Sequence, residues 1–187
     1  KPTKWNTAPV NRVEELGALL FDADRDGDRD LYIVSGGVEH PAHNALYRDR
    51  LYLNDGKGSF TEAPDALPAV RDSGGAIAAA DFDRDGDLDL FVGGRVIPGV
   101  YPLTPESRLL VNESTSGGEV KFRDATDQLA PGLRHAGLVT GGLWSDADGD
   151  GFLDLYLANG ADRQFHRDIL YASNGDGTFR NVTALVN

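Results

Sequence analysis

The sequence contains no cysteine, so disulfides contribute nothing to the fold and thiols say nothing about its redox compartment. It also lacks any run of about 20 apolar residues, the length that a membrane helix needs, so membrane insertion is not expected. Positive charge is scarce, because 18 Lys and Arg residues stand against 30 Asp and Glu residues. The resulting net charge of −12 argues against nucleic acid or an anionic membrane as a partner.

The chain begins at Lys1 with neither a methionine nor a signal sequence, which suggests a processed or excised piece. Hydrophobic residues make up 40% of its 187 residues, so it is not a disordered acidic tail. This length suffices for one substantial domain or for a few small repeats.

Negative charge is concentrated in three nine-residue segments of the form D-x-D-x-D-G-x-x-D, which begin at Asp22, Asp81 and Asp146. These segments hold 14 of the 30 acidic residues. Neighbouring carboxylates repel one another, so such clustering is costly unless a cation is bound. Three divalent ions would change the formal charge from −12 to −6.

The aspartate segments are part of a longer repeat, because their first residues are 59 and 65 positions apart. Each lies between two strand-like runs and is followed by two more runs that enclose an Asn/Asp/Gly turn, the signature of a β-hairpin. We therefore predict four strands in each of three repeats, approximately 16–66, 74–129 and 136–187. The expected strands are 17–21, 30–34, 51–54 and 59–62; 76–80, 89–93, 109–112 and 120–123; and 139–144, 154–158, 169–172 and 178–182.

A repeated unit of four antiparallel strands and about 60 residues is typical of a β-propeller blade. The sequence thus predicts an all-β fold, with residues 1–187 forming a single repeat region of three blades. Three blades cannot close the usual ring of four to eight. We expect an arc of a larger propeller, completed by the remaining blades of a larger chain, or a fragment that self-associates. A non-propeller array of small sheets is the alternative.

The aspartate loops have the composition of a calcium site, since calcium takes six to eight oxygen ligands. Aspartates at loop positions 1, 3, 5 and 9 can supply carboxylates, and position 7 can supply its backbone carbonyl. Glycine at position 6 permits a sharp reversal with positive φ. We predict about three Ca²⁺ sites with these ligands: Asp22, Asp24, Asp26, Asp28, Asp30, Asp81, Asp83, Asp85, Asp87, Asp89, Asp146, Asp148, Asp150, Phe152 and Asp154.

An EF-hand, a magnesium site and a metal-free turn all fit these loops less well than calcium does. An EF-hand needs Glu at position 12 and flanking helices, whereas position 12 here is Ile33, Val92 or Leu157 within a strand-like run. Magnesium usually retains several waters. An Asx-rich turn without metal is possible for a single loop, and three aligned copies argue against it.

Three elements of the repeat, DFDRDGDLDLFVGG, the later NDGKGSF or NGDGTF, and the trailing FRDAT and FRNVT, resemble the FG-GAP/VCBS repeat family, which includes the integrin α-subunit propeller. The resemblance extends over nearly the whole chain from about Leu16. It implies calcium ligation by the side chains of positions 1, 3, 5 and 9 and by the carbonyl of position 7. It also implies a calcium-stabilised, non-enzymatic propeller for adhesion, protein contact or glycan binding, placed extracellularly or in the cell envelope.

A second candidate surface is formed by the insert loops, residues 36–50, 94–108 and 160–168, which would share the face opposite the aspartate loops. Binding residues often lie on such loops, and aromatic and Arg side chains are common anchors. The conspicuous residues are His40, His43, Tyr47, Arg95, Tyr101, Arg163, Phe165 and His166.

The insert loops allow several interpretations. They could bind a protein or a glycan, or they could be solvated loops or contacts to further blades. A zinc or catalytic site made from His40, His43 and His166 is a weaker hypothesis. In the alternative function, the chain is part of a propeller enzyme that acts on polysaccharide through this face.

Overall fold

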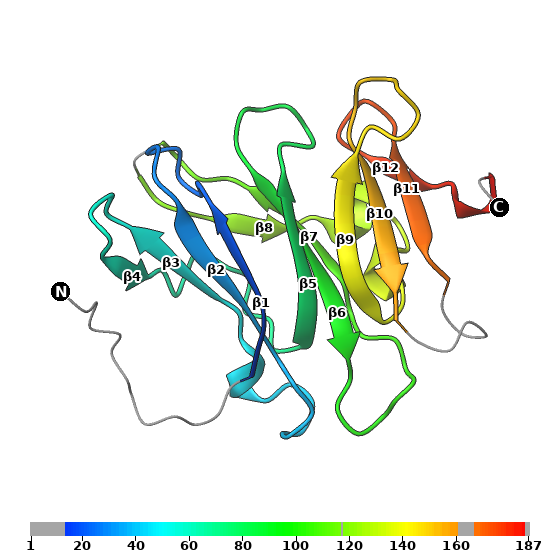
Figure 1. The fold of residues 1–187 in the computed structure, drawn as a ribbon, viewed down its shortest axis with the longest axis horizontal. Helices are drawn as coiled ribbons and strands as arrows, with labels where there is room; N and C mark the ends of the chain where they lie inside the picture. The colour runs from blue at the N-terminus through cyan, green and yellow to red at the C-terminus, as the bar shows by residue number, and fades with distance from the viewer. Residues whose placement is uncertain (1–13, 117, 161–166, 186–187) are drawn as a thin grey trace.

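The structure, a computed structural model, describes residues 14–116, 118–160 and 167–185. These residues form three four-stranded antiparallel sheets, which confirms the all-β prediction and the blade-like repeats (Figure 1). In this described part, no helix is long and apolar enough to cross a membrane.

Each sheet contains four strands that are consecutive in sequence and adjacent in space. Blade 1 consists of β1 (Glu14–Phe21), β2 (Asp30–Gly36), β3 (Arg50–Asn54) and β4 (Phe60–Glu62). Blade 2 consists of β5 (Ser73–Ala80), β6 (Asp89–Val96), β7 (Arg108–Asn112) and β8 (Phe122–Asp124). Blade 3 consists of β9 (Val139–Ser145), β10 (Asp154–Asn159), β11 (Ile169–Ser173) and β12 (Phe179–Asn181).

Among the residues that the structure describes, helical structure is confined to short segments outside the strands. The α-helix α1 (Thr126–Leu129) has only four residues, and the 3₁₀ turns η1 (Ala45–Tyr47), η2 (Leu133–His135) and η3 (Thr183–Leu185) have three each. This agrees with the all-β fold that the sequence predicts.

The hydrophobic core lies between the blades rather than within any one of them. Successive residues of a strand point to opposite faces of the sheet. Leu90 of β6 therefore packs toward blade 1, whereas its neighbour Phe91 packs toward blade 3. Blade 2 is thus covered on both faces, while blades 1 and 3 each have one face that no other described sheet covers.

Glycine allows the first strands of neighbouring blades, β1, β5 and β9, to lie close together. A Cβ added to Gly142 in β9 would lie 2.7 Å from a ring carbon of Phe91. A Cβ added to Gly17 in β1 would lie 2.5 Å from the carbonyl oxygen of Gly75. Real Cβ atoms do not approach so closely, so larger residues would force the blades apart.

Candidate metal centres

The three aspartate loops join the first and second strands of each blade and lie at the same end of the molecule (Figure 1). In each loop, one carboxylate oxygen from each of three residues lies within 4.8 Å of the other two. Oxygens that bind one calcium ion at about 2.4 Å can be no farther apart than about 4.8 Å. The groups are Asp22, Asp24 and Asp30; Asp81, Asp83 and Asp85; and Asp146, Asp148 and Asp154.

The predicted carboxylate ligands are therefore brought together only in part. Position 5 joins the group in the second loop but not in the first or third, where Asp26 and Asp150 lie outside it. Position 9 joins the group in the first and third loops, whereas Asp89 of the second lies outside it. The full set of four side chains per loop stays a prediction.

Backbone geometry gives each loop its reversal. Position 6 has positive φ in all three loops, as expected for Gly27, Gly86 and Gly151. Position 4 also has positive φ, at 61° for Arg25 and 65° for Arg84. The loop pattern did not predict this second left-handed position, and its only signal in the sequence is the glycine that occupies position 4 of the third loop.

Hydrogen bonds from the backbone orient the carboxylates of positions 1 and 3. The Gly27 amide donates to Asp22 Oδ2 at 3.1 Å, and the equivalent bonds to Asp81 and Asp146 measure 3.2 and 3.0 Å. The amide of position 5 donates in turn to the position 3 carboxylate in every loop. The same turn is therefore built three times.

The position 9 aspartate ties its loop to the third strand of the blade. Asp30 accepts from the Ala23 amide at 2.7 Å and from the Asn54 amide at 2.9 Å. Asp154 is held in the same way, by the amides of Ala147 and Ser173, both at 2.9 Å. This residue consequently has a structural role in addition to any ligand role.

Asp89, the position 9 residue of the second loop, is fully buried. Its Oδ1 accepts from the Asn112 amide at 2.9 Å, but its Oδ2 has no hydrogen-bond partner in the described structure. Burial, reinforced by the charges of neighbouring loop aspartates, raises the pKa of Asp89 to about 8. A cation near this group would favour its charged form.

Further buried carboxylate oxygens in the loops also lack a partner among the described residues. A buried, unsatisfied carboxylate oxygen is costly unless an ion compensates it. An all-oxygen donor set is what a hard cation such as calcium prefers, so the loops fit that ion. Two such oxygens are Asp22 Oδ1 and Asp81 Oδ1, both at position 1, whose carboxylate belongs to the converging group of its loop.

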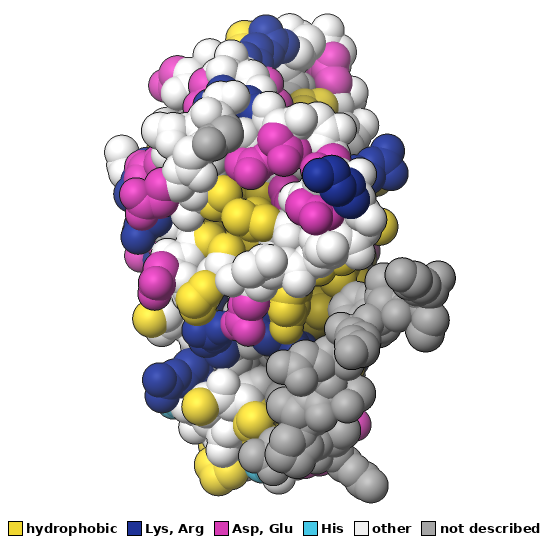
Figure 2. Space-filling view, turned by 90° about the vertical axis from the view of Figure 1, so that its left-hand side faces the viewer, with side chains coloured by type: hydrophobic (Ala, Val, Ile, Leu, Met, Phe, Trp, Pro, Cys, Tyr) yellow, Lys and Arg dark blue, Asp and Glu magenta, His cyan; other side chains and the backbone are white. Residues whose placement is uncertain are grey.

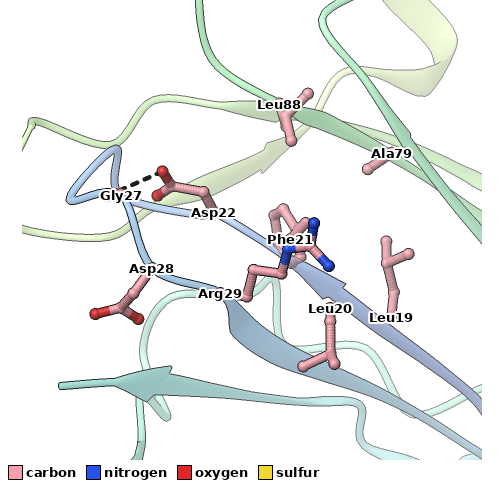
Figure 3. A pocket seen from close by; sticks show the side chains of 9 residues that line it. All are labelled: Leu19, Leu20, Phe21, Asp22, Gly27, Asp28, Arg29, Ala79 and Leu88. Atoms are coloured by element: carbon pink, nitrogen blue, oxygen red, sulfur yellow. Dashed lines mark hydrogen bonds between the residues drawn. The ribbon is translucent and has the colours of Figure 1, made fainter. Parts of the chain in front are cut away.

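In the first and third loops, the side chain of position 7 lies beside the hairpin that joins the third and fourth strands of the same blade. A Cβ on Gly56 would be 3.0 Å from Asp28 Oδ2, and a Cβ on Gly175 would be 3.2 Å from the Phe152 ring. Figure 3 shows the Asp28 carboxylate directed away from that of Asp22. This orientation is compatible with ligation through the backbone carbonyls of Asp28, Asp87 and Phe152, and that ligation stays a prediction.

A pocket opens next to the first loop, between blades 1 and 2 (Figure 3). Its apolar wall includes Leu19, Ala79 and Leu88, and the loop residues Asp22 and Asp28 line it from the other side. The polar side chains of the lining are the carboxylates of Asp22 and Asp28 and the guanidinium of Arg29.

Comparison with known proteins identifies the repeat. Residues 22–92 match the family described as FG-GAP-like repeat. The chain contains FG-GAP-like repeats. It is 32% identical over 149 residues, 77% of its length, to cartilage acidic protein 1 of Mus musculus and of Homo sapiens. The protein of that name from Xenopus tropicalis is 32% identical over 148 residues. The chain spans about a fifth of the length of these relatives.

Arginines at position 4 link one FG-GAP-like loop to the next. Arg25 donates to the carbonyl oxygen of Ser114 at 3.1 Å and lies 3.8 Å from Asp87 of the second loop. Arg84 donates to the carbonyl oxygen of Gly151, and its guanidinium carbon lies 3.9 Å from the centroid of the Phe152 ring. Sequence reasoning missed both contacts, since they depend on the packing of neighbouring blades.

The first two insert loops, residues 36–50 and 94–108, lie at the end opposite the aspartate loops (Figure 1), and most of the third, residues 160–168, falls outside the described residues. Tyr47 is buried, and its hydroxyl accepts from the His40 amide and donates to the His40 carbonyl. His43 Nδ1 lies 3.0 Å from Asp72 Oδ1. Tyr47 is therefore a core residue, and the idea of it as an exposed anchor is wrong.

The remaining insert-loop candidates differ in exposure, and Arg95, in β6, is partly buried. Arg163, Phe165 and His166 lie outside the described residues, so the three-histidine hypothesis is untested. Tyr101 is 65% exposed, and it lies with exposed Val100 and Leu103 at the tip of the 94–108 loop. In the described part of the chain, the clusters able to hold a cation consist of aspartates alone.

Proposed function

We propose that the chain is a calcium-binding FG-GAP repeat module that contacts a protein or a glycan outside the cytoplasm, extracellularly or in the cell envelope. The observation that carries the calcium part is the repeated convergence of three carboxylates beside buried oxygens that lack a partner. A purely structural turn would not require charges that repel one another.

Calcium in this proposal is structural. The ion neutralises the loop carboxylates, and Asp30 and Asp154 transmit the ordering of the loop to the third strand. Arg25 and Arg84 then connect an ordered loop to the following blade. Module stability should consequently depend on free calcium, which suits a compartment where its concentration stays high.

Chelation tests this proposal directly. With free calcium at about 100 times the dissociation constant, each site adds on the order of 2.7 kcal/mol to the free energy of unfolding. We expect excess EDTA to lower the melting temperature, measured by circular dichroism, and calcium to restore it. An unchanged melting curve with no metal retained by mass spectrometry would rule out the calcium sites.

Single substitutions test whether calcium binds at the loops rather than at surface carboxylates in general. Asp81→Asn removes one carboxylate from the second loop, so we expect calorimetry to show one ion fewer per chain. Asp65→Asn changes an exposed aspartate outside the loops and is the matched control. Equal stoichiometry in both variants would contradict the assignment of the second loop.

The exposed tip of the 94–108 loop supports the contact part of the proposal, because Tyr101 and its apolar neighbours are open to solvent. A glycan array and a partner pull-down with calcium present test it, with Tyr101→Ala as the variant. Turnover of a polysaccharide by the wild-type chain would instead favour the enzyme hypothesis.

A further inference from the structure

Each blade has two different sheet faces, which we name by the neighbour they contact. The front face packs on the preceding blade, and the back face packs on the following one. Blade 2 has both faces covered, by blades 1 and 3. The front face of blade 1 and the back face of blade 3 are the two ends of the array.

The front face of blade 1 presents apolar side chains at its surface. Leu20 is 54% exposed, and Leu31 and Tyr52 are half-buried beside it. The register pairs Leu20 with Leu31 and Leu31 with Tyr52, so the three side chains form a row across β1, β2 and β3. Figure 2 shows hydrophobic side chains gathered on this end of the molecule.

The back face of blade 3 carries a second apolar row. Leu143 is 60% exposed and Tyr156 is 40% exposed. Tyr156 pairs with Leu143 of β9 on one side and with Leu170 of β11 on the other. Both ends of the array therefore expose large apolar residues on a sheet face.

The internal junctions show which kind of face covers each row. Leu90 follows the second-loop aspartate as Leu31 follows the first, and Leu90 is buried against blade 1. Phe91 occupies in blade 2 the position of Tyr156 in blade 3, and Phe91 is buried toward blade 3. In the described structure, the front faces of blades 2 and 3 are therefore each covered by the back face of the preceding blade.

Charged groups at the internal junction also have counterparts on the exposed faces. At the junction of blades 1 and 2, the Tyr32 hydroxyl donates to Asp49 at 2.9 Å, and Arg108 of blade 2 lines the same small cavity as this pair. On the exposed back face of blade 3, the Tyr156 hydroxyl likewise donates to Asp168, at 2.8 Å.

The front face of blade 1 carries the matching cation. Arg50 pairs with Ile33 in β2 as Arg108 pairs with Val92 in β6, so Arg50 occupies the position of Arg108. Its side chain is 23% exposed and bonds Glu15 at 2.8 Å. The two ends therefore carry a tyrosine–aspartate pair and an arginine at positions that line one small cavity where blades 1 and 2 meet.

We propose that the back face of blade 3 in one copy of this chain docks on the front face of blade 1 in a second copy. The contact reproduces the junction of blades 1 and 2, with Leu143, Tyr156 and Leu170 against Leu20, Leu31 and Tyr52. It brings Arg50 of one copy to the Tyr156–Asp168 pair of the other. Such a contact is heterologous, because the two copies use different surfaces.

Mixing two variants tests whether the back face of blade 3 in one copy contacts the front face of blade 1 in another. Leu20→Arg blocks the front face and Leu143→Arg blocks the back face, both at exposed positions that tolerate a polar residue. We expect wild-type protein with calcium to show an average mass above one chain in sedimentation equilibrium, and each variant alone to be monomeric. A mixture of the two should form a one-to-one dimer, because each variant keeps one intact face.

Val38→Arg, at a 59% exposed position in the loop after β2, is the matched control and should associate like the wild type. Circular dichroism shows whether each variant is folded. Should Leu20→Arg fail to fold, Arg50→Glu is the second front-face variant and Asp168→Arg is its partner, with opposite charges restored in the mixture.

Three results would overturn the proposal: a monomeric wild type at every concentration, variants that still self-associate, or variants that do not dimerise when mixed although the wild type associates.

Discussion

Asp49 is a partly buried acid that lines the small cavity between blades 1 and 2. It accepts hydrogen bonds from the Ser35 amide at 2.8 Å and from the Tyr32 hydroxyl at 2.9 Å. Burial nevertheless dominates and raises its pKa from 3.8 to about 6, although Arg108 across the junction opposes the shift. The folded protein therefore binds the Asp49 proton more tightly than the unfolded chain does.

This shift predicts a pH dependence with a definite sign. The contribution of Asp49 to stability is fully present below about pH 3.8 and is lost as the pH rises toward 6. Asp49→Asn does not titrate, so wild-type stability should fall relative to the variant across this window by on the order of 3 kcal/mol. Urea unfolding of both proteins in EDTA at several pH values measures the difference. A difference that stays constant with pH would contradict the assigned cause.

At the scale of the element, the first strand of each blade sets how closely the blades pack. In β9, Gly142 faces the buried ring of Phe91, whereas Gly141 faces the other side, where a Cβ would meet only Ala158 at 3.7 Å. Neighbouring glycines on one strand therefore occupy very different environments.

A pair of alanine substitutions tests this difference. Gly142→Ala should lower the free energy of unfolding by about 1–3 kcal/mol, because its methyl group overlaps Phe91. Gly141→Ala, the control, should change it by less than about 1 kcal/mol or stabilise the protein slightly. Urea denaturation with calcium present measures both, and equal losses would show that strand propensity rather than packing is responsible.

The strands were predictable from sequence because their causes are local. Alternating apolar residues and Asn/Asp/Gly turns indicate all twelve described strands. The glycine at position 6 of each loop predicts the positive φ found there. The contacts of Arg25 and Arg84 and the burial of Tyr47 were not predictable, since each depends on residues from another strand or blade. The loops were recognised, but which aspartates converge depends on how each loop packs.

For the whole molecule, blade 2 differs from its neighbours because both of its faces are covered. Leu90, Phe91 and Leu109 are completely buried. Amides in such a doubly packed sheet open only when a large part of the molecule unfolds.

We therefore expect hydrogen–deuterium exchange to be slowest in β6 and β7, and faster in β1 and β9. The Leu20→Arg variant, which we expect to be monomeric, is the form to use, because association would also protect the ends. Equal protection in all three blades would indicate that the array unfolds as a single unit.

The strand order within the sheets has a consequence for synthesis. Every described sheet pairs only strands that are consecutive in the chain, so each strand finds its partner within a short sequence separation. Pairing over short sequence separations has a low loop-closure cost and proceeds quickly. The chain can consequently fold from its N-terminus as it emerges from a ribosome or a translocation pore, each new hairpin adding to a finished neighbour.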